Sequence, residues 1–586
     1  MKLDVFAISN VDDAVIFWRT DDRIKGCWGY AIERERRLDD GSIRRDILEN
    51  RAGLPKDEPR PNQHRPSTEW PFQRFSWTDH SVNQGDVVRY RVVPMLFSQG
   101  KLSQALDMRS NWTPWLTLSE EAGDKTNLLF NRGLVISQFM SRYLEDLRVK
   151  EGLGTLDDAL GAFKKSLDDH ELPIRKFLSG ELRRKLLELL QAAKSEKRIV
   201  WAALYELDDE ELIAGLEKLG SRCRIVLANG SIQPQKGVPA AELRKKDQNK
   251  KARARLLKAG AEVHDRMISP GALGHNKFLV VTDAKRKPLA AWTGSTNWTK
   301  TGLCTQINNG FYVENSDFAQ TYLDQWDRLK DAKSDFPADL VEENSVAKSI
   351  KVGKSDMRIW FTRTRGKVDL DAIEDVLGKA KDAVLFLMFQ PGGSGPFGTI
   401  EKLVGRKDLY VKGVVSTLPP KKNGAADDED TVEVVTVGDG QKRPPMMLDI
   451  VQPEGIKTPF ASWAATVTRK DFLSGKNKVG FAIVHSKVIV VDPFTKPVVI
   501  TGSHNFSSSA SQKNDENFVI VRDNPKLAMQ YAAHILSVYQ HYRWLNVVYD
   551  KQRRNKLPTV PLAEADTWQD RHLKGASKRE IDFWVR

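Results

Sequence analysis

One motif occurs twice in this chain, and the repeat decides the fold. The first copy reads GHNKFLVVTDAKRKPLAAWTGSTNWT over residues 274–299, and the second reads VHSKVIVVDPFTKPVVITGSHNFS over residues 484–507. Each copy runs His-x-Lys, four apolar residues, a turn with Lys-Pro, a second apolar stretch, Gly-Ser-x-Asn and an aromatic residue. The histidines His275 and His485 lie 210 residues apart (485 − 275), about the size of one α/β domain. The repeat therefore predicts two similar α/β units.

The spacing within each copy predicts a site. A histidine and a lysine two positions apart on a strand point to the same face of its sheet. The Gly-Ser-x-Asn turn ends the next strand, and we expect its serine hydroxyl and asparagine amide to bind phosphate oxygens. Two units related by a pseudo-twofold axis bring both sets around one anion. The expected catalytic residues are His275, Lys277, Asn297, His485, Lys487 and Asn505, with Ser295 and Ser503 supporting them.

Two histidines and two lysines around one anion suit phosphoryl transfer. One histidine attacks phosphorus and the other protonates the leaving oxygen, while the cationic and amide groups stabilise the developing charge. This chemistry calls for no metal and no cofactor. The three cysteines, Cys27, Cys223 and Cys304, are scattered along the chain, so neither a disulfide framework nor a cysteine zinc site is expected.

The two copies resemble the repeat of the phospholipase D superfamily, which reads His-x-Lys, four residues, Asp and then Gly-Ser-x-Asn. The resemblance covers roughly residues 125–545, and the motif matches twice. It implies a phosphodiesterase that works through a phosphohistidine intermediate. Family precedent makes the N-terminal histidine, His275, the nucleophile and His485 the acid and base.

The two copies depart from the family pattern in different ways. The family aspartate falls on Asp492 in the second copy, whereas Thr282 takes that position in the first. The family also has a glutamate after Gly-Ser-x-Asn that orients the histidine. Glu516 supplies it in the second copy, and Asn308 stands there in the first. We therefore expect His275 to lack a carboxylate partner. The stronger carboxylate support for His485 leaves the order of nucleophile and acid open.

The rest of the chain predicts a mixed α/β fold: two pseudo-twofold-related phospholipase D-like domains, with mixed sheets flanked by helices, preceded by an all-β sandwich. Up to about residue 115 the chain alternates apolar and polar residues as strands do, with no helical period between them. The segment SVNQGDVVRYRVVPM resembles late strands of a fibronectin type III domain, with Tyr90 at a tyrosine-corner position. The expected domains are a fibronectin-like sandwich over 1–118, repeats over 119–350 and 351–548, and a polar tail over 549–586.

The charge of the chain bears on its substrate. The formal net charge is +13, which suits a polyanionic partner. A basic segment, residues 242–258, precedes the first motif. We expect four of its lysines, Lys245, Lys246, Lys250 and Lys251, to bind a phosphate backbone. These features, with a motif form that looks like the nuclease branch, favour a nuclease acting on DNA or RNA.

Two alternatives stay open. The first is a phospholipase D that hydrolyses or transfers phospholipid head groups, because two copies in one large chain are usual for lipid-cleaving members. The second is a catalytically degenerate polyanion-binding protein, against which the intact histidines, lysines, serines and asparagines argue. The sequence shows no signal peptide and no apolar run of the roughly 18 residues that span a bilayer. We expect a cytoplasmic protein whose active unit is a monomer, because both motif copies lie in one chain.

Overall fold

The computed structural model describes residues 2–59, 63–134, 143–144, 146–404, 406, 408–416, 434–436, 450–452, 484–555 and 561–586. The chain forms two compact units. The first is built from Met1–Glu120, Glu433–Val451 and Met529–Arg586, and the second from Glu121–Val432 and Gln452–Ala528. Each unit has its own hydrophobic core.

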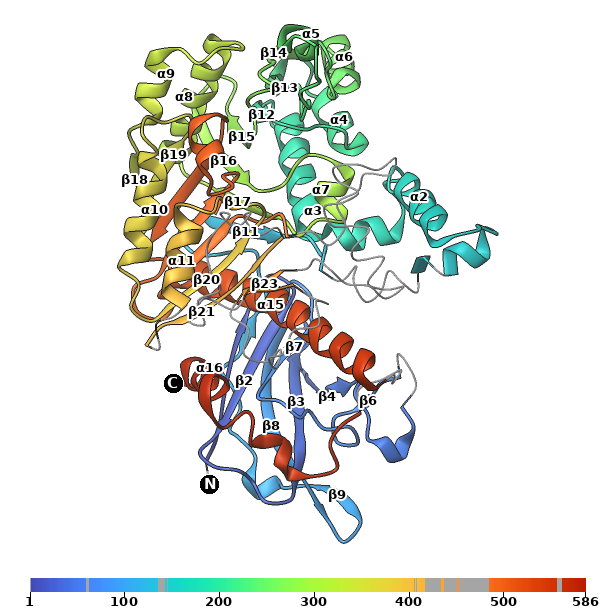
Figure 1. The fold of residues 1–586 in the computed structure, drawn as a ribbon. Helices are drawn as coiled ribbons and strands as arrows, with labels where there is room; N and C mark the ends of the chain where they lie inside the picture. The colour runs from blue at the N-terminus through green and yellow to red at the C-terminus, as the bar shows by residue number, and fades with distance from the viewer. Residues whose placement is uncertain are drawn as a thin grey trace. The chain divides into compact units, whose positions relative to one another are not determined.

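The first unit is rich in antiparallel strands, as the alternating pattern predicts (Figure 1, blue). One sheet has the order β1 (Leu3–Ser9), β2 (Ala14–Thr20), β7 (Ser76–Asp79). The other has the order β10 (Leu116–Thr117), β8 (Val87–Ser98), β3 (Cys27–Arg37), β4 (Ile43–Ile47), with β9 (Lys101–Gln104) paired to β8. Trp18, Tyr30 and Tyr90 come from both sheets into one buried cluster, because alternate residues of a strand point to the same face. The hydroxyl of Tyr90 donates to the Asp79 carboxylate at 3.0 Å.

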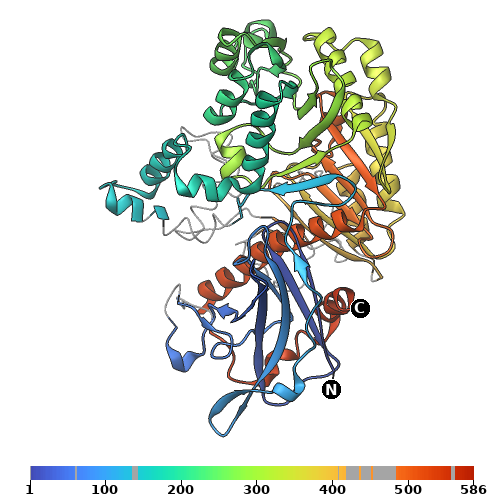
Figure 2. The ribbon, with the colours of Figure 1, turned by 180° about the vertical axis from the view of Figure 1, so that it is seen from behind.

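The last residues of the chain belong to this β-rich unit. The short helix η5 (Asp566–Gln569) and α16 (Gly575–Trp584) lie beside its strands in both views (Figures 1 and 2). The Trp568 indole donates to the Cys27 carbonyl at 2.9 Å, and Trp584 stacks on Phe17 with ring centroids 4.9 Å apart. The part of the predicted polar tail that the structure describes is thus folded. Its few aromatic residues carry large apolar areas, which outweigh the polar composition between them.

The second unit contains two sheets of matching topology. The first has the order β11 (Thr126–Phe130), β17 (Asn309–Val313), β16 (Pro288–Gly294), β15 (Lys277–Thr282), β12 (Ile199–Leu204), β13 (Cys223–Ala228), β14 (Glu262–Arg266). The second includes, in order, β18 (Lys348–Val352), β19 (Ser355–Phe361), β26 (Asn517–Arg522), β25 (Val498–Gly502), β24 (Val488–Val491), β20 (Ala383–Met388), β21 (Tyr410–Val415).

The two motif strands occupy equivalent places in these sheets. β15 lies antiparallel between β12 and β16, and β24 lies antiparallel between β20 and β25. The next strand outward is parallel in both sheets, β13 beside β12 and β21 beside β20. The predicted mixed α/β class is confirmed. All residues of β15 and β24 are buried, which explains why both read as continuous apolar runs rather than alternating ones.

Helices cover these sheets. The described ones are α2 (Leu156–Ser166), α3 (Pro173–Ser195), α4 (Glu210–Glu217), α5 (Ala240–Arg244), α6 (Lys250–Lys258), α7 (Lys300–Cys304), α8 (Ser316–Ala332), α9 (Ala338–Asn344), α10 (Val368–Gly378), α11 (Pro396–Val404) and α14 (Ser508–Gln512). A further helix, α15 (Pro525–Asn555), carries the chain from the second unit into the first. Within the described part of the chain, no helix is long and apolar enough to cross a membrane.

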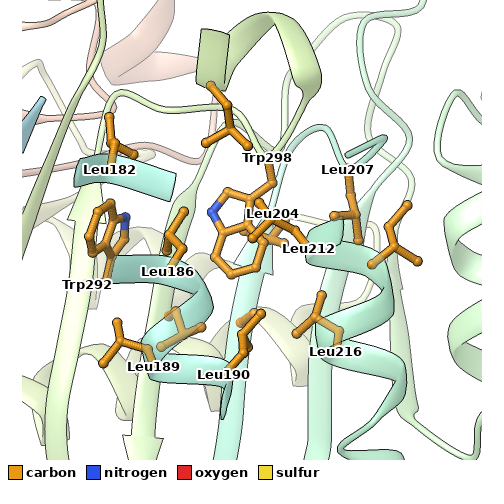
Figure 3. Packing of buried hydrophobic residues seen from close by; sticks show 14 of the residues in the cluster. Leu182, Leu186, Leu189, Leu190, Leu204, Leu207, Leu212, Leu216, Trp292 and Trp298 are labelled. Carbon is orange, nitrogen blue, oxygen red and sulfur yellow. The ribbon is translucent and has the colours of Figure 1, made fainter. Parts of the chain in front are cut away.

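The core beneath the first motif copy fixes the position of its turn. Leu186 and Leu190 of α3 and Leu212 of α4 pack around Trp298, which follows the motif asparagine (Figure 3). Trp298 is fully buried, and its backbone N–H donates to the Glu206 carbonyl at 3.2 Å. The aromatic residue after Gly-Ser-x-Asn therefore anchors the turn from below and leaves the polar side chains of the turn at the site.

Candidate active site

Each motif histidine lies just before a central strand. The residue that precedes it pairs with the other half of the second unit, that is, with the sheet that contains the other motif copy. His275 precedes β15 and His485 precedes β24. Gly274 forms a β-bridge with Asp515 from the second half, and Val484 forms one with Ile307 from the first. These two cross-bridges bring each histidine to the segment that ends with the other copy's orienting residue. The expected pseudo-twofold arrangement thus rests on backbone pairing as well as on side chains.

The orienting residues are exchanged between the halves. The Nδ1 atom of His275 lies 2.7 Å from the Glu516 carboxylate, and Nδ1 of His485 lies 2.9 Å from the Asn308 side-chain oxygen. The expectation that His275 lacks a carboxylate was wrong, because the carboxylate comes from the second copy. Sequence order assigns Glu516 to the nearer histidine, and only the cross-bridges reveal the actual partner.

These contacts fix the tautomer of both rings. A carboxylate and an amide oxygen are acceptors only, so Nδ1 carries the proton in each histidine. The Asn308 amide is itself held the right way round, because its Nδ2 donates to the Gly302 carbonyl at 2.9 Å. In both neutral rings the lone pair therefore lies on Nε2. The difference between them is a charged partner for His275 and a neutral one for His485.

The motif serines support the orienting residues. The Ser503 hydroxyl donates to Glu516 at 3.0 Å, and the Ser295 hydroxyl donates to Asn308 at 2.8 Å. Both serines are fully buried. We expected these hydroxyls to bind phosphate oxygens, whereas the structure uses them to hold the groups that orient the histidines.

The motif lysines and two aromatic rings flank the histidines. Lys277 and Lys487 are buried, and each ammonium donates to the carbonyl of its own motif histidine, at 2.7 and 2.5 Å. Each ammonium also lies 4.9 Å from a ring centroid, Lys277 over Tyr205 and Lys487 over Phe389. The same rings form T-shaped contacts with the histidines. The ring centroids of Tyr205 and His275 lie 4.8 Å apart, and those of Phe389 and His485 lie 4.7 Å apart.

Sequence reasoning missed both rings. Each is the first residue after the strand that pairs with the motif strand, β12 or β20. An aromatic residue at the end of a buried strand usually belongs to the core. The signal that could have found them is their equivalent position relative to the two repeats.

The motif asparagines differ in their surroundings. The Asn297 amide donates to a carboxylate oxygen of Glu206 at 2.6 Å, and its own side-chain oxygen is buried without a hydrogen-bond partner. The side-chain oxygen of Asn505 is also buried and unpartnered. Glu206 follows Tyr205, and the equivalent residue after Phe389 is Gln390. Glu206 was not predicted from sequence.

Burial and mutual repulsion set the charges of the site. Burial lowers the pKa of His275 to about 4, although Glu516 opposes the shift. Burial and the two lysine charges hold the pKa of His485 well below its usual value. Burial lowers the pKa of Lys277 to about 7 and that of Lys487 well below its usual value. Burial raises the pKa of Glu516, but His275, His504 and Lys277 together more than offset it, so this carboxyl stays ionised.

Asp492, expected to support the site, lies at the other end of β24 from His485. Its carboxylate accepts backbone N–H bonds from Asp382 at 2.7 Å and Ala383 at 3.0 Å. In the first copy the corresponding Thr282 hydroxyl accepts from the Trp201 indole at 3.1 Å. The family aspartate position therefore closes a loop at the far end of the strand, so its loss from the first copy leaves the site intact.

The basic segment is partly neutralised within the protein. Lys245 pairs with Glu242 at 2.7 Å, and Lys251 pairs with Glu210 at 2.5 Å. The Lys246 ammonium donates to the Gln235 side chain at 3.1 Å. For Lys250, the described residues include no ion-pair partner. Two of the four predicted backbone-binding lysines thus have carboxylate partners that compete with a phosphate.

Metal and cofactor sites were not expected from the sequence. Over the described ranges, no group of three or more His, Cys, Asp or Glu side chains is arranged to hold a metal ion. The polar groups at the site are imidazoles, ammonium groups, amides and two carboxylates engaged with His275 and Asn297.

A family model described as "Cardiolipin synthase, PLD-like domain" matches residues 186–330 and 427–539. Both motif copies fall inside these stretches, which together span less than half of the chain. The match supports the phospholipase D superfamily. It also supports a phosphodiesterase-type enzyme, and hence a phosphodiester substrate. A curated relative, "Phospholipase D" of Rickettsia prowazekii (strain Madrid E), is 49% identical over 49 residues, which are 8% of this chain and 22% of that one.

Several solved structures are also similar to the chain. Phosphatidylserine synthase of Haemophilus influenzae Rd KW20 has 12% identity over 70% of this chain and 94% of its own, with a TM-score of 0.37. The phospholipase D family member NUC of Salmonella typhimurium has 18% identity over 32% and 96%, with a TM-score of 0.19. Yeast tyrosyl-DNA phosphodiesterase has 12% identity over 56% and 84%, with a TM-score of 0.29. These TM-scores are too low to assign a substrate.

Proposed function

We propose that this chain is a metal-independent phosphodiesterase that forms a phosphohistidine on His275, with His485 as acid and base. The observation that carries the proposal is the exchange of orienting residues: His275 meets the Glu516 carboxylate at 2.7 Å, and His485 meets a neutral amide. A carboxylate on Nδ1 stabilises the positive charge that a ring acquires when its Nε2 bonds to phosphorus. A neutral amide does so less, which suits a ring that must give up its proton.

In the first step Nε2 of His275 attacks phosphorus, and the bond from phosphorus to the leaving oxygen breaks. The electron pair of that bond goes to the leaving oxygen, which takes the Nε2 proton of His485. In the empty site His485 is neutral, because burial and the two lysines hold its pKa low. An incoming phosphodiester anion offsets those charges and raises that pKa, so the acid is formed only with substrate present.

In the second step His485 removes a proton from water, and the water oxygen attacks phosphorus. The phosphorus–nitrogen bond breaks, its electron pair returns to His275, and a phosphate monoester leaves. Lys277 and Lys487 stabilise the negative oxygens in both steps, since their ammonium groups are buried where electrostatic interactions are strong. These residues supply the proton transfers and charge stabilisation that the reaction needs.

For the substrate we propose nucleic acid first, because the formal net charge of +13 favours a polyanion. The ion pairs of Lys245 and Lys251 weaken the support that the basic segment gave this choice. A phospholipid is the second candidate, favoured by the family description and the curated phospholipase relative. Intact motif side chains in both halves argue against a degenerate binding protein.

One assay tests activity and substrate class together. The purified chain is incubated with single-stranded DNA, duplex DNA or phosphatidylcholine vesicles, with EDTA present throughout. We expect turnover of DNA, unaffected by chelation. Turnover of vesicles alone selects the phospholipase. Loss of all activity on chelation, restored by a divalent ion, contradicts the metal-independent mechanism.

A further inference from the structure

Besides the orienting residues Glu516 and Asn308, the two halves of the site differ at a second charged position, which the proposed chemistry does not use. Glu206 stands two residues beyond β12, next to Tyr205, which contacts His275. In the second half Phe389 takes the place of Tyr205 and Gln390 that of Glu206. The pseudo-twofold comparison thus isolates a carboxylate that the two-histidine mechanism does not require.

The Glu206 carboxylate binds the Asn297 amide, which the proposed function assigns to the substrate phosphate. Its carboxylate accepts from the Asn297 amide at 2.6 Å, so this amide faces Glu206. The backbone on both sides of the contact is fixed, because Trp298 N–H donates to the Glu206 carbonyl at 3.2 Å. A phosphate oxygen that binds the Asn297 amide therefore arrives beside a carboxylate. At Asn505 no carboxylate contact occurs among the described residues.

The charges around Glu206 come from a few groups. Lys277, on β15, lowers the pKa of Glu206, whereas Asp208, in the same loop, raises it; Asp208 in turn lies beside Lys300 at the start of α7. Burial is the largest effect and brings the pKa of Glu206 to about 7. When ionised, Glu206 is, after Glu516, a second counter-charge of Lys277. An anion bound at the site replaces it in that role, and a neutral carboxyl then removes the repulsion.

We propose that Glu206 is a specificity-determining residue, which must take up a proton when the site binds an anion and which thereby selects monoanionic phosphodiesters over dianions such as phosphate monoesters. The inference rests on the proposed function, because it assumes that Asn297 and Lys277 hold the phosphate. Its consequence for turnover is direct. The product of hydrolysis is a monoester that becomes dianionic near neutral pH, so the same carboxylate that admits the substrate helps to expel the product.

Binding of unreactive anions tests the proposal without turnover. Sulfate is a dianion and dimethyl phosphate a monoanion throughout the neutral range, so neither changes charge in the experiment. Calorimetric titration of the full chain in buffers of different ionisation enthalpy gives the affinity and the number of protons taken up. For the wild type we expect sulfate binding to weaken by more than roughly tenfold per pH unit above about pH 7, because Glu206 contributes one linked proton and Lys277 loses its own proton in the same range.

Two variants and a control make the result specific. In Glu206→Gln we expect proton uptake to fall and sulfate to bind roughly tenfold tighter at about pH 8, with a smaller gain for dimethyl phosphate. Gln390→Glu places a second carboxylate at the equivalent position in the second half. We expect the sulfate affinity of this variant to depend more steeply on pH than that of the wild type. Asp208→Asn removes a nearby carboxylate that does not contact Asn297. Because Asp208 raises the pKa of Glu206, we expect this variant to keep proton uptake but to shift it to lower pH.

Several results would overturn the proposal. Equal proton uptake in the wild type and Glu206→Gln contradicts it, as does an equal gain for sulfate and dimethyl phosphate. If Glu206→Gln does not fold, an unchanged pH dependence in Gln390→Glu contradicts it instead. Failure of the proposed function looks different: diesters are then not cleaved at all, while the anion-binding differences between the variants remain.

Discussion

The two halves of the second unit build the same local geometry and give it different electrostatics. Each has a buried lysine bonded to the carbonyl of its histidine, an aromatic ring against that histidine and a serine behind the orienting residue. They differ in that His275 receives a carboxylate and His485 an amide. The repeat thus supplies two equivalent histidines, and in the proposed mechanism one exchanged residue pair makes one of them the nucleophile and the other the acid.

The largest expected effect comes from removing the histidines. Both His275→Ala and His485→Ala should abolish turnover of an ordinary diester, since loss of a general acid alone costs about 10²–10⁴-fold and loss of the nucleophile costs more. A substrate with an acidic phenol as leaving group separates the two. Because such a group departs without a proton, its release should persist as a burst in His485→Ala and be absent in His275→Ala. Equal bursts in both variants contradict the division of labour.

The next effect concerns the orienting residues. Glu516→Gln removes the charge opposite His275, and we expect kcat to fall by about 100-fold or more. Asn308→Asp is the matched change in the other half. It gives His485 a carboxylate, makes its imidazolium a weaker acid and should slow only substrates with poor leaving groups, by roughly tenfold. Steady-state kinetics on a phenol ester and an alkyl ester measure both effects. A larger loss in Asn308→Asp reverses the proposed roles.

The pH dependence of kcat/KM should follow the free enzyme. Turnover should rise as pH increases through about 4, where His275 loses its proton and becomes nucleophilic. It should fall above about pH 7, where Lys277 loses its charge and Glu206 gains one, because both changes weaken binding of an anion. A profile on a small bis-aryl diester checks this. Activity that keeps increasing through neutral pH contradicts it.

The smallest effect should come from the basic segment, and only for nucleic acid. Reversing Lys246 and Lys250 to Glu should weaken DNA binding for all sequences alike and flatten its dependence on salt by about 0.7–0.9 per lost phosphate contact. Reversing Lys245 and Lys251, which have carboxylate partners, should matter less. Salt titrations of DNA affinity compare the pairs. Equal affinity of wild type and both variants removes this segment from the substrate site.

The sequence predicted the elements of the site better than their connections. His275, Lys277, Asn297 and their second-half counterparts follow from spacing, because residues two apart on a strand share a face and the Gly-Ser-x-Asn turn ends the adjacent strand. The partner of each histidine does not follow from spacing. Glu516 stands 31 residues after His485 (516 − 485) and 241 after His275, yet it contacts His275.

Other features could not be predicted from the sequence, because tertiary contacts give them their roles. Glu206 reads as one acidic residue at the start of an acidic stretch, and only its contact with Asn297 places it in the site. The fold of the C-terminal residues depends on Trp568 and Trp584 packing on distant strands, which a polar average conceals. Even so, the alternation of strands and helices was sufficient for the mixed α/β class, and both motif strands are buried along their whole length.

The most direct test of this account is the identity of the phosphorylated residue. The wild-type chain is mixed with an aryl phosphodiester, quenched within one turnover under alkaline denaturing conditions that preserve phosphohistidine, and digested for peptide mapping by mass spectrometry. We predict that the phosphoryl adduct lies on the peptide containing His275, and that it accumulates further in His485→Ala. An adduct on His485, or rapid turnover with no adduct on either histidine, contradicts the central claim that the Glu516-supported histidine is the nucleophile.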